Sequence, residues 1–68
     1  MKTLSGKGFS KLLENKGWIL KRINGSHHIY KHSLKTEIIS LPIHKNDSLK
    51  IGLQKKLMSI ADINDSEL

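Results

Sequence analysis

The stretch that decides the fold is Trp18–His32, which reads WILKRINGSHHIYKH. Apolar and polar residues alternate on both sides of Asn24-Gly25, and a period of two is typical of a half-buried strand. Asn-Gly is the dipeptide that best suits a two-residue type I′ turn between antiparallel strands. The pattern therefore predicts a β-hairpin made of residues 18–23 and 26–32.

The predicted hairpin divides its side chains between two faces. A two-residue turn at Asn24-Gly25 places Arg22 opposite His27. Successive side chains of a strand point to opposite faces, so we expect His27 and His28 on different faces. The expected face of His27 also carries Trp18, Leu20, Arg22, Ile29 and Lys31, and the expected face of His28 carries Tyr30 and His32.

The residues before the hairpin predict a helix within residues 4–17. Phe9 and Leu13 lie at helical spacing on one apolar face. Ser5 is a typical N-cap residue, and Gly17 is a typical residue just past a helix end.

After the hairpin the pattern predicts a turn, a third strand and a second helix. Residues 36–42 read TEIISLP and end at Pro42, which suits the end of a strand. Residues 52–61 read GLQKKLMSIA and predict a helix. The expected buried stripe of this helix is Leu53, Leu57, Ile60 and Ala61. The order α-β-β-β-α is an α+β fold, and a three-stranded antiparallel sheet with two helices on one face is the architecture of a double-stranded-RNA-binding domain.

Length and composition narrow the class of protein. The chain has 68 residues and no cysteine, which allows one small domain and excludes disulfides and thiolate chemistry. We expect the domain to cover residues 1–63 and residues 64–68 to form an acidic, frayed tail. No signal-peptide pattern and no apolar run of about 18 residues occurs, so a cytoplasmic protein is expected.

Positive charge is concentrated before the tail. The net charge is +6, but three of the six acidic residues, Asp62, Asp65 and Glu67, lie within the last seven residues. All the basic residues except Arg22 are lysines. Lysine contacts phosphate as a point charge, whereas bidentate base recognition favours arginine. The charge therefore indicates contact with a nucleic-acid backbone or an acidic protein, unless the lysines only solvate the surface.

Three of the four histidines lie in or beside one strand, and three explanations are open. Zinc needs three or four converging ligands, but strand geometry separates His27 from His28 and puts His32 about 13 Å from His28. A strand histidine that hydrogen-bonds locally is the ordinary explanation, and we favour it for His32. Catalysis is the third, because imidazole can act as acid or base in RNA cleavage while a cation such as Arg22 stabilises the phosphate charge.

The motifs of the chain, taken in order, resemble those of the HicA family, the small RNA-cutting toxins of HicA–HicB toxin–antitoxin pairs. The resemblance runs from about Leu4 to Ile63. The matching motifs are Gly17-Trp18, Gly25-Ser26-His27, Pro42-x-His44 and Leu49-x-x-Gly52. Each is weak alone, but four in register on an independently derived order of elements are specific. The chain departs from the family at Ala61-Asp62, where members commonly have Ala-Gly.

The resemblance implies a metal-independent ribonuclease that cuts mRNA (an mRNA interferase), with no cofactor. The essential histidine of the family's second strand corresponds to His27. His28 is the runner-up, because a register slip of one residue would exchange their faces. Gly25 and Ser26 would form the hairpin that presents this histidine. The implied partners are mRNA and a HicB-like antitoxin.

Several parts of this functional interpretation stay open. We expect Arg22, Lys21, Lys31 and Lys45 to bind the RNA backbone. The second proton-transfer group is not identified, and His44, Tyr30 and His28 are its candidates. The rival function is a non-catalytic module that binds double-stranded RNA. Such a module needs a basic cluster at the start of a helix, and the chain offers only Lys50, Lys55 and Lys56 there.

Overall fold

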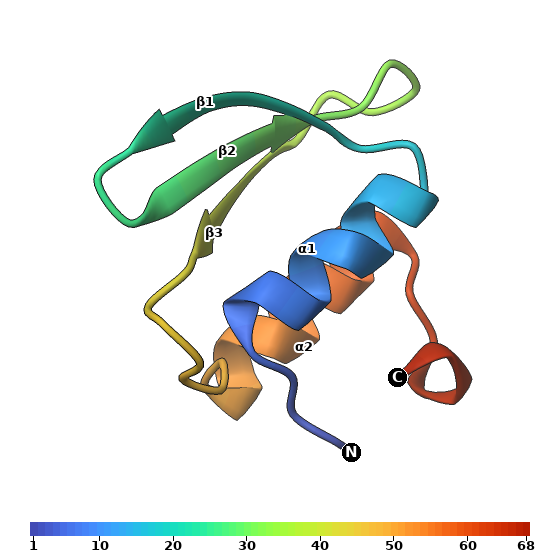
Figure 1. Ribbon diagram of the computed structural model, residues 1–68. Helices are drawn as coiled ribbons and strands as arrows, with labels where there is room; N and C mark the ends of the chain where they lie inside the picture. Colours follow the sequence, from blue (N-terminus) through green and yellow to red (C-terminus); the bar gives the residue numbers. More distant parts are fainter.

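A three-stranded antiparallel sheet carries two helices on one face in the computed structural model, which describes residues 1–68 (Figure 1). The elements are α1 (Gly6–Asn15), β1 (Ile19–Asn24), β2 (His27–Lys31), β3 (Ile38–Pro42), α2 (Ile51–Ala61) and a 3-10 turn η1 (Asp65–Glu67). The strands lie in the order β1-β2-β3. The predicted α-β-β-β-α fold is confirmed. Neither helix is long and apolar enough to cross a membrane.

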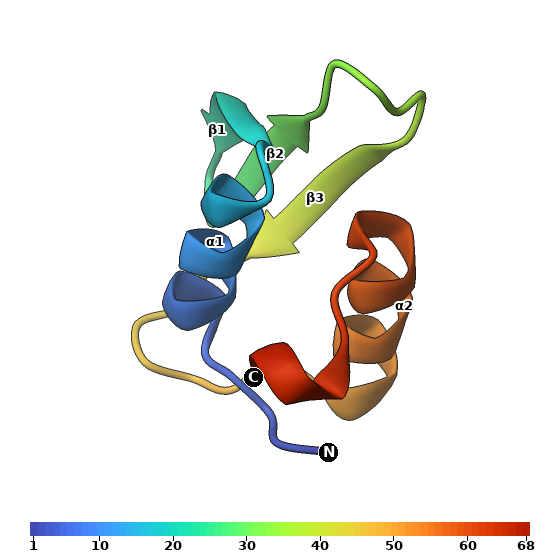
Figure 2. The same cartoon turned by 90° about the vertical axis from the view of Figure 1, so that its right-hand side faces the viewer.

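The core lies between the sheet and the helices (Figure 2). It contains Phe9 and Leu13 of α1, Tyr30 of β2, and Ile39 and Leu41 of β3, all at most 1% exposed. These residues recur at a spacing of three to four in the helix and of two in the strands, as burial of one face of each element requires. Ser5 caps α1 as predicted, since its Oγ accepts a hydrogen bond of 3.0 Å from the Gly8 N–H.

The buried stripe of α2 includes a polar residue that the sequence pattern missed. Leu57 and Ala61 are buried as predicted, but Gln54 is also fully buried. Its Oε1 accepts a hydrogen bond from the Leu4 N–H, and its Nε2 donates to the Lys2 carbonyl oxygen. Gln54 thereby fixes the N-terminal segment to α2, and a satisfied amide of this kind can be buried without large cost.

The turn of the β1–β2 hairpin lies one residue later than predicted. Asn24 pairs with His27, so Gly25 and Ser26 form the two-residue loop. Gly25 has φ +57° and Ser26 has no positive φ, which is the pattern of a type II′ turn with glycine in the first position. Arg22 consequently pairs with Ile29, and the expectation that it lies opposite His27 is wrong.

A β-bulge between Leu20 and Arg22 shifts the register again. Leu20 pairs with the buried Tyr30 and so belongs to the helix-covered face, and Trp18 is only 2% exposed. The expectation that Trp18 and Leu20 share a face with His27 is therefore wrong. A bulge sets two residues of one strand against one of the other, and here the extra residue is Lys21.

The face of the sheet away from the helices is called the open face below. Cross-strand pairing assigns it Ile19, Arg22, Asn24, His27, Ile29, Lys31, Ile38, Ser40 and Pro42. Within β2 the alternation is as predicted, because His27 lies on the open face while His28 and the buried Tyr30 lie on the covered one.

The acidic tail, which we expected to fray, makes defined contacts. Leu68 packs against the core, and η1 begins with a capping box in which the Asn64 N–H donates to Glu67 Oε2. The Lys16 ammonium forms an ion pair with Glu67 across the gap to α1. The division of the chain into a domain of residues 1–63 and a tail stays a prediction.

Candidate functional site

His27 is the first residue of β2 and lies exposed on the open face. Its neighbours across the sheet are Asn24 in β1 and Pro42 in β3. No side chain or backbone group hydrogen-bonds to its ring in the structure. Both ring nitrogens of His27 are therefore free to meet a ligand on this face.

His28 and Tyr30 point to the opposite side of the strand. His28 is half-buried and pairs with Ile23 and Leu41. The Tyr30 hydroxyl donates a hydrogen bond of 3.5 Å to Glu14 Oε2, and burial raises the pKa of this hydroxyl. Neither group reaches the open face where His27 lies.

His44 is brought to the start of β2 by the segment that follows β3. The Ile43 N–H donates a hydrogen bond of 2.8 Å to the Ser26 carbonyl oxygen. The Ser26 hydroxyl and His44 Nε2 lie 3.3 Å apart and share a second hydrogen bond. Ser26, which we expected only to shape the hairpin, thus connects the chain neighbour of His27 to His44. The only signal for this contact in the sequence was the Pro42-x-His44 motif.

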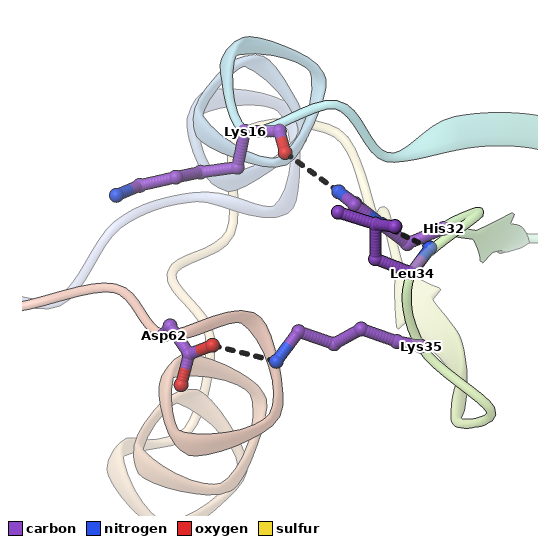
Figure 3. Close-up of polar contacts among 5 residues, drawn as sticks. All are labelled: Lys16, His32, Leu34, Lys35 and Asp62. Atoms are coloured by element: carbon purple, nitrogen blue, oxygen red, sulfur yellow. Dashed lines mark hydrogen bonds and ion pairs between the residues drawn. The ribbon is translucent and has the colours of Figure 1, made fainter.

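His32 has a local structural role, as its sequence position suggested (Figure 3). Its Nδ1 accepts a hydrogen bond from the Leu34 N–H, so the ring hydrogen is on Nε2, which donates to the Lys16 carbonyl oxygen; both distances are 3.0 Å. The ring also packs edge-on against Trp18, with 5.3 Å between ring centroids. Both nitrogens of His32 are therefore occupied by the end of α1 and the β2–β3 loop.

Three of the four cations proposed to bind RNA lie in β1 and β2. Arg22 and Lys31 belong to that face by register. Lys21, at the bulge, lines a hollow of about 390 Å³ together with Ile19 and Lys31. Lys45 does not join this cluster, because it lies in the loop beside His44, with φ +52°.

Exposed isoleucines lie among these cations. Ile19 and Ile38 flank Lys31 on either side in one cross-strand row, and they are 56% and 55% exposed. Ile29, the next residue of β2 on the same face, is half-buried. Apolar groups exposed together and rimmed by charge are typical of a surface that binds another macromolecule.

The arrangement suits acid–base chemistry on a phosphodiester. The open face presents one unpaired imidazole and cations along its strands, and a second imidazole, that of His44, lies just beyond β3 in contact with Ser26. Imidazole transfers protons near neutral pH, and nearby cations stabilise charge that develops on phosphate oxygens. No three His, Asp or Glu side chains converge as metal ligands.

Comparison with known families gives one finding. A family model described as "HicA toxin of bacterial toxin-antitoxin" matches residues 6–63, which includes every strand, both long helices and the residues discussed above. No curated protein matches the chain.

Proposed function

Because the chain belongs to the HicA family, and is therefore a toxin of a toxin–antitoxin system, we propose that it is an endoribonuclease that cuts mRNA without a metal ion. The observation that supports this most is the position of His27. Its ring is exposed, makes no intramolecular hydrogen bond and shares the open face with Arg22 and Lys31.

The proposed reaction uses the 2′-hydroxyl of the RNA as its nucleophile. A base removes the proton of this hydroxyl, the 2′-oxygen bonds to phosphorus, and the bond from phosphorus to the 5′-oxygen breaks as that oxygen receives a proton. The products are a 2′,3′-cyclic phosphate and a 5′-hydroxyl. His27 performs one of the two proton transfers.

The cations hold the RNA backbone in this proposal. Arg22, Lys21 and Lys31 follow the open face away from His27, so they bind phosphates on one side of the scissile bond. Lys45, beside His44, binds on the other side. Binding of this kind depends on salt, because each neutralised phosphate releases counterions.

The first test compares the wild type with His27→Ala and His28→Ala. Each protein is expressed from a repressed promoter, and the growth of the cells is measured. Each is also purified and mixed with end-labelled RNA in the presence of a chelator. We expect wild type and His28→Ala to stop growth and cleave RNA to 5′-hydroxyl products. His27→Ala should lose at least about 10²-fold in rate.

Other outcomes have definite meanings. Loss of cleavage with chelator, or products with a 5′-phosphate, would contradict the metal-free mechanism. Activity lost only in His28→Ala would assign the reaction to the covered face. Tight binding of double-stranded RNA with no cleavage by any of the three proteins would favour the RNA-binding module.

Family membership implies a cognate antitoxin, and we propose that it is HicB-like and covers the open face. The exposed isoleucines offer it apolar area, and the surrounding cations fit an acidic partner. Docking there would block access of RNA to His27.

Two matched variants, each replacing an exposed apolar residue with aspartate, test this surface. Ile38→Asp on the open face should weaken the complex with the antitoxin at least about 10-fold, a loss typical of an interface anchor. Leu34→Asp is the control, because Leu34 is 87% exposed in the β2–β3 loop, away from the strands. Affinity is measured by titration at two salt concentrations. Equal affinity for wild type and Ile38→Asp would place the antitoxin elsewhere.

A further inference from the structure

We propose that His44 is the second catalytic residue, the general acid that complements His27. This inference rests on the proposed function and adds the residue that protonates the leaving 5′-oxygen. It is supported by the contact between Ser26 and His44, by the register that brings His44 near His27 and by the places of the other candidates.

The other candidates lie where they cannot reach a substrate bound at His27. Tyr30 is 1% exposed and its hydroxyl is directed to Glu14. His28 is on the covered face between Ile23 and Leu41. His32 uses both ring nitrogens for backbone hydrogen bonds at the opposite end of β2.

His44 lies near His27, at the Gly25-Ser26 end of the hairpin. The hydrogen bond from the Ile43 N–H to the Ser26 carbonyl continues the β2–β3 pairing one residue past Pro42. Ile43 packs against the core, whereas the side chain of the neighbouring His44 is exposed in the loop that follows β3. His44 is then the diagonal neighbour of His27, and such residues lie about 7–8 Å apart across a sheet. Two imidazoles at this separation can approach one phosphodiester from two sides.

Ser26 orients the ring of His44 for proton donation. Its hydroxyl oxygen, 3.3 Å from Nε2, can accept the hydrogen of that nitrogen. The Nδ1–H of a protonated ring is then free to donate to the leaving oxygen. His44 also borders a hollow of about 300 Å³ with Pro42, Asp47 and Lys50, which is room for part of the leaving nucleotide.

The two histidines divide the reaction between them. As the bond between the 2′-oxygen and phosphorus forms, the 2′-hydroxyl proton moves to His27. As the bond between phosphorus and the 5′-oxygen breaks, the proton of His44 moves to that oxygen. The proton gained by His27 and the proton lost by His44 are exchanged with solvent afterwards, so the enzyme is restored.

Two substrates separate an acid from a positioning residue. The first is an RNA oligonucleotide, whose 5′-alkoxide leaving group needs a proton. The second is a ribonucleoside 3′-(p-nitrophenyl phosphate), whose phenolate leaves without one. We expect His44→Ala to slow RNA cleavage about 10²–10⁴-fold and to leave cleavage of the ester nearly unchanged. His27→Ala should slow both, because both need the 2′-hydroxyl to be deprotonated.

Two further variants complete the experiment. His44→Gln can still hydrogen-bond to Ser26 but cannot transfer a proton at neutral pH, so it should show the same loss on RNA as His44→Ala. Asn46→Ala, an exposed change in the same loop, should retain full activity on both substrates. Urea unfolding of each variant checks that its fold is unchanged.

Several results would overturn the inference. RNA cleavage that is normal in His44→Ala, or restored in His44→Gln, would remove His44 from proton transfer. An equal loss on RNA and ester in His44→Ala would make His44 a positioning residue. If His27→Ala kept the ester activity and His44→Ala lost it, the two roles would be reversed. In each of these cases the proposed ribonuclease activity still stands. A wild type that cleaves neither substrate would overturn that activity and this inference together.

Discussion

Two glycines in the first turns of the two helices have opposite surroundings. A Cβ at Gly6 would lie 2.3 Å from the Pro42 carbonyl oxygen and 3.0 Å from the Ile43 Cα. A Cβ at Gly52 would have no atom within 4 Å. The missing side chain of Gly6 therefore allows α1 to approach the end of β3, whereas Gly52 makes no contact that requires glycine.

The same substitution should have opposite effects at these two residues. Gly6→Ala should lower the free energy of unfolding by about 1–3 kcal/mol, because backbone atoms of β3 must move. Gly52→Ala should raise it by about 0.5–1 kcal/mol, because alanine favours the helix and no atom is displaced. Urea titration followed by the fluorescence of the buried Trp18 measures both. A Gly6→Ala protein as stable as wild type would show that the approach of α1 to β3 is not required.

At the scale of an element, the β1–β2 hairpin shows what the sequence could predict. The period of two predicted both strands, and in β2 it also predicted which residues share a face. It could not predict the turn, because Asn24-Gly25 and Gly25-Ser26 are both acceptable loops and cross-strand packing decides between them. It also missed the bulge at Lys21, which puts Trp18 in the core and Leu20 on the helix-covered side while Arg22 stays on the open face.

The helices also separate features that local sequence predicts from features that depend on tertiary contacts. Ser5 as N-cap and the apolar face of α1 were predicted because they depend on neighbours three or four residues away. The burial of Gln54 was not, because its partners are Lys2 and Leu4, about fifty residues earlier in the chain. His27 was proposed as the catalytic histidine from the Gly-Ser-His motif, and that stays a prediction. The contact of His44 with Ser26 depends on tertiary structure that no local pattern contains.

At the scale of the whole molecule, two carboxylates near the C-terminus neutralise lysines away from the open face. Glu67 pairs with Lys16 at the end of α1. Asp62 pairs with Lys35 of the β2–β3 loop at 2.6 Å, as Figure 3 shows. Arg22 and Lys31 form no ion pair. The open face thus keeps its positive charge unpaired, which would favour the approach of a polyanion to that face.

These ion pairs should make the stability of the protein depend on acid pH. The hydrogen bond from Lys35 lowers the pKa of Asp62, and the hydrogen bond from Lys16 lowers that of Glu67. A carboxyl whose pKa is lower in the folded state stabilises the protein above its unfolded pKa, and this contribution is lost as pH falls through the folded pKa.

A double variant isolates that contribution. Asp62→Asn with Glu67→Gln removes both titrations, and asparagine tolerates the left-handed backbone of Asp62, with φ +56°. Between about pH 6 and pH 3 the urea midpoint of the double variant should therefore fall less than that of wild type, with the clearest difference at low salt. Asp47→Asn is the control, because Asp47 forms no ion pair, and it should retain the wild-type dependence. If the double variant and wild type lost stability in parallel, the ion pairs would not contribute, and residues 62–68 would be held by the apolar residues Ile63 and Leu68 alone. The paired lysines would then be as available to a polyanion as those of the open face.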